Sequence, residues 1–263
     1  MELFLEGFPI FLLIFCRITS FFVVAPVFST RTVPTMMKVG LSFIVALLIF
    51  LSYGLKQTIV PDATYVLAVI REVLAGLLLG YTAYLFFTII QTAGAFIDLQ
   101  MGFGMANVID PLTGVSSPLM GNFKFMVGTL VFLSMNGHHF LLNALLKSYE
   151  WIPISNELFA RVYDGSISEF LLRTFADTFM LALQMSAPLV VAMFLVDAGL
   201  GLLAKTAPQY NVFVIGAPMK ILIGFLLLAA LMPGLIDLFE NIFTLMFSAL
   251  EKLFGIVQAR AEQ

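Results

Sequence analysis

The sequence predicts an all-α membrane protein, built as a bundle of long, kinked apolar helices. Of its 263 residues, 61% are hydrophobic and only 11% are charged, whereas soluble domains carry about 25% charged residues. The mean hydropathy is +1.04. The apolar residues also gather into six runs, several of which reach the roughly 20 residues that a helix needs to cross a bilayer.

The six runs are expected to be helices. The third contains 36 residues, and a single helix of that length extends about 54 Å, nearly twice the hydrocarbon thickness of about 30 Å. It is therefore expected to be one long helix that is tilted or projects from the bilayer. Pro188 should kink or divide the fifth run, and Pro233 with Gly234 should break the sixth. The runs are Leu3–Phe28, Val39–Tyr53, Thr64–Leu99, Lys124–Leu146, Ile167–Ala204 and Ile221–Leu250.

Charge and cysteine content exclude several classes of protein. The net charge of −3 provides no basic surface for nucleic acid. Cys16 is the single cysteine, so an intramolecular disulfide is impossible. The start of the chain is acidic and has no basic segment before its apolar run. A cleaved signal peptide is therefore not expected, and the first helix should remain in the mature protein.

Two connectors predict the orientation in the membrane. Ser29–Lys38 and Lys205–Lys220 each carry two basic residues and no acidic residue. Both follow odd-numbered runs, so they lie on the same side, and the positive-inside rule assigns that side to the cytoplasm. Both termini are then expected on the other side.

The segment Met101–Phe123, with the sequence MGFGMANVIDPLTGVSSPLMGNF, differs from the rest of the chain. Its glycines and prolines oppose a regular helix, yet it is too apolar for an ordinary solvated loop. Lipid cannot satisfy irregular backbone, so the segment must be buried in protein or line a cavity. It is interpreted either as a constriction or plug, or as a connecting loop packed on neighbouring helices.

Charged side chains within the runs predict mainly structural roles. Glu169, Arg173 and Asp177 recur every four residues, so they form one stripe on a helix and are expected to be structural ion pairs. Arg71–Glu72 is interpreted as a solvated helix start. Asp197 lies in an apolar run and is a candidate functional residue, with a hydrogen bond at a subunit interface as its alternative.

No catalytic residue, metal site or cofactor is expected. His138 and His139 are adjacent and point about 100° apart on a helix, and no cysteine or acidic residue follows at ligand spacing. Ser116 and Ser117 lack an organised base. An intramembrane enzyme therefore has no group of residues to support it.

Four stretches in order resemble the FliR family, the flagellar members of the FliR/SctT-like type III secretion export-gate proteins. The resemblance covers essentially the whole chain. The stretches are FCRITSFFVVAPVFSTRTVP (Phe15–Pro34), AGAFIDLQMGFGMANVIDPLTG (Ala93–Gly114), FLSMNGHHFLL (Phe132–Leu142) and APQYNVFVIGAPMKI (Ala207–Ile221).

The resemblance implies a non-enzymatic core subunit of the flagellar export gate in the bacterial inner membrane, within the flagellar basal body. Residues 1–176 would be a FliP-like helical part, and residues 177–263 a FliQ-like helical hairpin. Its partners would be FliP-like and FliQ-like subunits, a FlhB-like switch protein and unfolded flagellar export substrates. Part of the chain would lie above the bilayer, buried against those partners.

The resemblance also favours the plug interpretation of residues 101–123. Methionine is flexible enough to seal and reopen, and apolar constrictions exclude water by dewetting. Asp110-Pro111 suits a tight turn. The expected plug residues are Met101, Gly102, Phe103, Gly104, Met105, Asp110, Pro111, Leu112, Gly114, Leu119 and Met120.

The second candidate site is a cytoplasmic-side loop at the gate entrance, interpreted equally as a plain hairpin turn. Its residues are Lys205, Gln209, Tyr210, Asn211 and Lys220. Two alternative functions stay open. One is the equivalent subunit of a virulence type III system. The other is a free-standing membrane transporter, although transporters usually show two matched halves and this chain does not.

Overall fold

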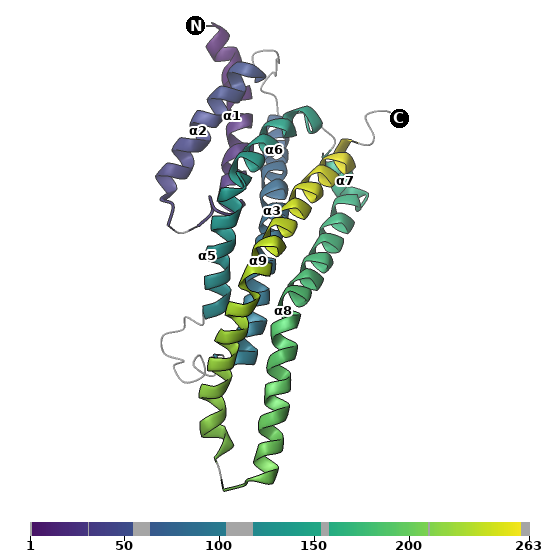
Figure 1. Ribbon diagram of the computed structural model, residues 1–263. Coiled ribbons are helices and arrows are strands. Elements are labelled where there is room, and N and C mark those ends of the chain that lie inside the picture. Colours follow the sequence, from purple (N-terminus) through teal and green to yellow (C-terminus); the bar gives the residue numbers. More distant parts are fainter. Residues whose placement is uncertain are drawn as a thin grey trace. The chain divides into compact units, whose positions relative to one another are not determined.

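The computed structural model (Figure 1) describes residues 2–30, 32–54, 64–103, 118–153, 158–209 and 211–258. Within these ranges every regular element is helical, which confirms the predicted all-α class. The helices are α1 (Glu2–Val24), α2 (Thr35–Ser52), α3 (Tyr65–Met101), α5 (Leu119–Ser134), α6 (Gly137–Trp151), α7 (Leu158–Tyr163), α8 (Ser166–Thr206) and α9 (Val212–Gln258).

Five of these helices are long and apolar enough to cross a membrane, and there are six candidates if α5 and α6 count as one span. The five are α1, α2, α3, α8 and α9. The third predicted run forms one uninterrupted helix of 37 residues, as expected from its continuous apolar sequence.

The helices are not divided at their prolines: α8 continues through Pro188, where a kink or a division was expected, and the break expected at Pro233 is wrong. Pro188 lies inside α8, and both Pro218 and Pro233 lie inside α9. A proline removes one backbone hydrogen bond, but in an apolar environment the remaining peptide groups are best satisfied by continuing the helix. The helices therefore run through these positions.

Two other boundaries also differ from the prediction. The fourth run is divided, because α5 ends at Ser134 and Asn136 takes a left-handed conformation with φ of 57° before α6. Asparagine tolerates this conformation better than most residues. The second basic connector is much shorter than expected, since Lys205 still lies in α8 and α9 already begins at Val212.

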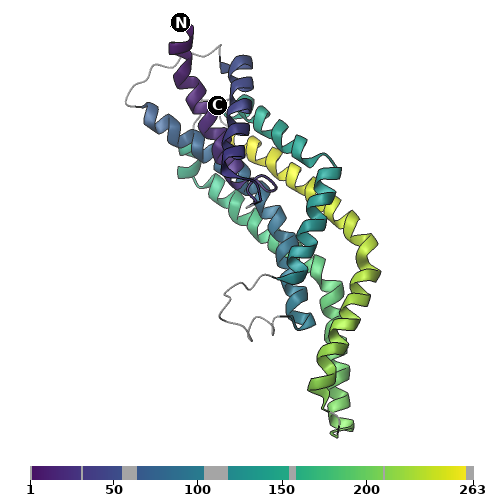
Figure 2. The same ribbon diagram turned by 90° about the vertical axis from the view of Figure 1, so that its left-hand side faces the viewer.

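The chain forms two compact units, each assembled from separate segments. Unit 1 contains residues 1–85, 136–174 and 244–263. Its core is apolar side chains of α1, α3 and α6, including Leu13, Phe21 and Leu145, all buried. Helices α1 and α2 contact each other in this unit (Figure 2).

Unit 2 contains residues 86–135 and 175–243. Three aromatic rings form part of its core: Phe87 and Phe132 lie 5.1 Å apart, and both contact Phe243. Within this unit α8 and α9 form a hairpin and lie side by side (Figures 1 and 2). The predicted division into residues 1–176 and 177–263 stays a prediction.

Candidate functional site

The predicted plug enters and leaves the described structure through two helix ends of unit 2. Helix α3 ends at Met101, and Gly102 follows with φ of 90°, a conformation that glycine adopts without strain. Helix α5 begins at Leu119, directly after Pro118. Six predicted plug residues lie outside the described residues: Gly104, Met105, Asp110, Pro111, Leu112 and Gly114.

A buried carboxylate joins these two helix ends. Both oxygens of Asp98, in the last turn of α3, accept the Met120 backbone N–H at 3.0 Å. The Gly121 N–H donates to the same side chain at 3.4 Å. Helix α5 has no side-chain cap from Pro118, so Asp98 supplies from α3 the acceptor that the first turn needs. A carboxylate there also suits the positive end of the helix dipole.

The charge of Asp98 has a further partner in Lys124. Both residues are almost fully buried, at 6% and 2% exposure, and the two charges attract each other. A buried cation is costly unless it is compensated. Asp98 therefore links the end of α3 to the start of α5 and also to the Lys124 charge on the next turn of α5.

A close backbone approach strengthens this junction. A Cβ atom on Gly94 of α3 would overlap the Cα and N atoms of Gly121 in α5. A Cβ atom on Gly121 would lie 3.2 Å from the carbonyl oxygen of Gln91 and 2.9 Å from Pro118. Small residues allow helices to pack at this distance where no water drives their association. The end of α3 and the start of α5, which are the two stems of the segment, are thus held against each other.

Two methionines predicted to form the plug, Met101 and Met120, are part of a buried apolar cluster in unit 2. Met101 and Met120 are 1% and 3% exposed. They pack with Ile97, Leu189, Met193 and Leu228, and Phe103 covers the cluster. A Cβ atom on Gly224 of α9 would lie 2.5 Å from the Met101 Cε, the end of a flexible side chain, so α9 packs closely against Met101 there. Leu119, by contrast, is 55% exposed. Whether any of these side chains seals a channel stays a prediction.

An ion pair beside this cluster links the hairpin of unit 2 to α3. Lys220 of α9 lies 2.8 Å from the Asp197 carboxylate of α8. The Gln100 amide, next to Met101, donates to the same carboxylate at 2.9 Å. Asp197, expected as a functional candidate, is therefore paired, and Lys220 belongs to a helix instead of the predicted loop.

The rest of the predicted cytoplasmic-side loop is partly described. Lys205 and Gln209 are exposed, and Tyr210 lies outside the described residues. Asn211 directly precedes α9, and its backbone and side-chain oxygens both accept the Val214 N–H. Lys205, Gln209 and Asn211 thus lie at the connection between α8 and α9, and their role as a contact site stays a prediction.

The most buried charged group in unit 1 was not predicted. The Arg17 guanidinium donates from Nε to Glu72 at 2.6 Å and from Nη2 to the other Glu72 oxygen at 2.8 Å. It also donates to the backbone oxygens of Ser148 and Ile152, and it lies 4.2 Å from the Tyr149 ring centroid. Arg17 and Glu72 are both fully buried. The expectation that Glu72 is solvated at a helix start is therefore wrong, because its partner lies 55 residues away in α1.

The remaining candidates offer no reaction centre within the described residues. Arg173 pairs with Glu169 while both side chains are largely exposed, and Asp177 is exposed on α8. The rings of His138 and His139 lie 4.2 Å apart. In the described part of the chain, no group of three or more potential ligands is placed to hold a metal.

The sequence is similar to those of bacterial export proteins. The family model for bacterial export proteins, family 1, matches residues 8–246. The flagellar biosynthetic protein FliR of Bacillus subtilis is 40% identical over 253 residues, covering 96% of this chain and 97% of the relative. FliR of Escherichia coli is 31% identical over 91% of this chain and 90% of its own length. The Yop proteins translocation protein T of Yersinia pestis is 32% identical over 81% of both chains.

Proposed function

Since this chain belongs to the bacterial export proteins, family 1, we propose that it is a core subunit of the flagellar type III protein export gate. The family consists of export proteins, so the chain is a transport component and not an enzyme. Its long apolar helices make it a multi-pass protein of the cell membrane.

The assignment to the flagellar system is supported by the relatives. FliR of Bacillus subtilis shares 40% identity over nearly the whole of both chains, whereas the Yersinia translocation protein shares 32% over a shorter region. The equivalent subunit of a virulence type III system is the second candidate, favoured by that second similarity.

The plug function rests on one observation, the joining of the two stems by Asp98. A segment that closes a channel must be held at a fixed place on the wall and still be displaceable. Asp98 and the Gly94–Gly121 contact hold Met101 and Leu119–Met120 together, and Gly102 supplies a permissive backbone at the exit of α3. Residues 104–117 then form the closing part, which excludes ions and small molecules until an unfolded substrate displaces it.

The partners are FliP-like and FliQ-like gate subunits, with a FlhB-like switch protein near Lys205 and Gln209. The exposed apolar side chains of the unit 2 hairpin support this. Phe194 and Leu195 of α8 and Leu226 of α9 are each about two-thirds exposed, at 64%, 65% and 64%. Large apolar side chains gathered on a surface are typical of an interface with protein or lipid. The hairpin from residue 177 onward serves as the FliQ-like part of the chain.

Co-expression with the FliP-like and FliQ-like proteins of the same organism tests this function. We expect the three chains to co-purify in detergent and a deletion strain to lose flagellar export. Deletion of Met105–Ser117 should leave co-purification intact and make cells permeable to small ions. A stable monomer with no affinity for either partner would contradict the proposal, and solute uptake by the chain alone in proteoliposomes would favour the free-standing transporter.

A further inference from the structure

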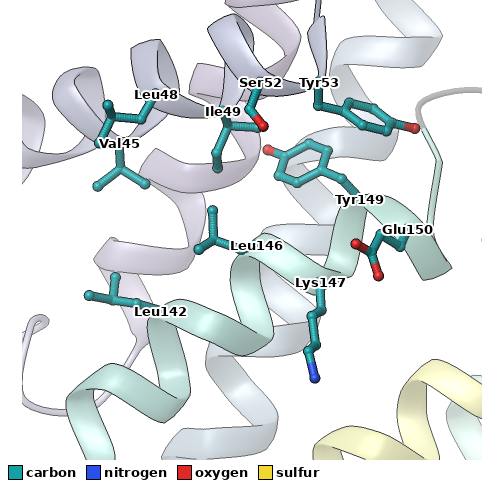
Figure 3. Close-up of a pocket in the computed structure, with 10 residues that line it drawn as sticks. All are labelled: Val45, Leu48, Ile49, Ser52, Tyr53, Leu142, Leu146, Lys147, Tyr149 and Glu150. Carbon is teal, nitrogen blue, oxygen red and sulfur yellow. The ribbon is translucent and has the colours of Figure 1, made fainter.

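An open groove lies between α2 and α6 of unit 1, and none of its lining residues belongs to the plug or its stems. It encloses about 480 Å³, within the range of ~300–1,000 Å³ typical of small-molecule sites. Figure 3 shows its walls. Residues of α2 and the following turn form one side, and residues of α6 form the other.

The greater part of the groove is apolar and is not closed by the chain itself. Val45, Leu48 and Ile49 of α2 lie opposite Leu142 and Leu146 of α6 (Figure 3). Leu48 is 62% exposed and Leu146 is 45% exposed. Because α2 is long and apolar enough to span a membrane, this wall is suited to an acyl chain.

The α6 wall also carries one positive and one negative charge. Lys147 and Glu150 line the groove one helical turn apart, which separates their Cβ atoms by about 5–6 Å. Both are exposed. Among the described residues, neither takes part in an ion pair. Lys147 also borders a second cavity, where Glu251 of α9 is the acidic residue. The neighbouring hydroxyl of Tyr149 already donates to the Ile14 carbonyl oxygen.

This combination of an apolar wall with both charges defines the occupant. We propose that the groove binds a zwitterionic glycerophospholipid with a phosphate and a primary ammonium, such as phosphatidylethanolamine. One acyl chain lies between Leu48 and Leu146, the phosphate binds Lys147, and the ammonium binds Glu150. The short linker of this headgroup matches two side chains separated by one helical turn.

Other occupants satisfy fewer of these groups. A fatty acid or an anionic phospholipid would pair with Lys147 and leave Glu150 facing a like charge. An apolar helix of a partner would cover the leucines and offer no group to bind either charge. Its lining residues are none of those assigned to the plug, so the proposal stands or falls independently of the proposed export function.

Native mass spectrometry of the full chain in detergent tests the proposal. The probes are phosphatidylethanolamine and phosphatidylglycerol with identical acyl chains. We expect the wild-type protein to retain phosphatidylethanolamine preferentially. Lys147→Gln and Glu150→Gln should each weaken its binding about tenfold or more, since each removes a charged hydrogen bond. Lys205→Gln and Glu169→Gln, which change exposed charges elsewhere, are the matched controls and should bind like the wild type.

A variant that fills the groove keeps the test independent of the charges. Leu146→Trp should reduce binding of both lipids, while circular dichroism confirms that its helices and melting transition are retained. Equal retention of the two lipids by the wild type, or equal binding by Lys147→Gln and Lys205→Gln, would overturn the proposal. A photo-crosslinker at Leu48 that captures a protein in native membranes, with no phospholipid adduct, would also overturn it by assigning the groove to a partner helix.

Discussion

Replacing Asp98 by asparagine tests the junction that holds the stems of the plug. The asparagine side chain would keep one carbonyl oxygen for the Met120 N–H and lose the charge and the second acceptor. Loss of a helix cap costs about 0.5–2 kcal/mol, and loss of a charge-assisted bond costs about 1.5–3 kcal/mol. These terms overlap because they describe the same hydrogen bonds. The expected loss in free energy of unfolding is therefore about 2–3 kcal/mol.

The assay is reversible unfolding in mixed micelles, followed by circular dichroism. Asp177→Asn, at an exposed carboxylate on α8, is the control and should change the free energy of unfolding by less than about 0.5 kcal/mol. Part of the cost arises because Lys124 is left buried without its counter-charge. Adding Lys124→Met to Asp98→Asn should therefore restore about 1–2 kcal/mol, within the range of coupling energies between interacting residues. The reasoning about this junction would be refuted if Asp98→Asn lowered the free energy of unfolding no more than Asp177→Asn does. It would also be refuted if the effects of Asp98→Asn and Lys124→Met on the free energy of unfolding simply added.

Two further predictions concern packing and charge. Glu72→Gln should lower the free energy of unfolding by about 3 kcal/mol or more, because it leaves the Arg17 guanidinium buried without a counter-charge. The control, Glu169→Gln, removes an exposed ion pair and should change the free energy of unfolding by less than about 1 kcal/mol. Equal effects of the two substitutions in the same denaturation assay would contradict a buried ion pair. Gly94→Ala should be destabilised by about 1–3 kcal/mol through overpacking against Gly121, whereas Gly199→Ala, where a Cβ atom meets nothing within 4 Å, should be neutral or stabilised. A Gly94→Ala protein as stable as Gly199→Ala would exclude the close approach of α3 and α5.

Features set by local sequence were predictable, and the long third helix is the clearest case. Its apolar residues continue without a strong breaker from Thr64 to Leu99, and the observed helix spans Tyr65–Met101. The same local reasoning failed at Pro233, where α9 continues, and Pro188 does not divide α8. There, the demand for hydrogen-bonded backbone in an apolar environment exceeds the cost of one missing donor.

The charged contacts were not predictable from spacing along the chain. Arg17 and Glu72 lie 55 residues apart, so the position of one in the sequence does not predict the other as its partner. Arg17 did interrupt an apolar run, and a charge in such a run signals a partner somewhere in the fold. Asp98 gave a weaker signal, because its role depends on backbone groups of Met120 and Gly121 that only the folded chain brings near.

The export family followed from four stretches in order, and the matching family model confirms it. The plug interpretation of residues 101–123 stays a prediction, and the structure shows that Asp98, Gly94 and Gly121 hold its two ends together. Met101 and Met120 lie in the supporting cluster.

Conductance of the purified gate complex in planar bilayers tests the central claim most directly. The wild-type complex should be closed to small ions, and a complex lacking Met105–Ser117 should conduct while keeping the same subunits. A complex carrying Asp177→Asn, at an exposed residue of α8, should stay closed. If the complex without Met105–Ser117 remained as closed as the wild type, the segment would be a packed loop and not a plug.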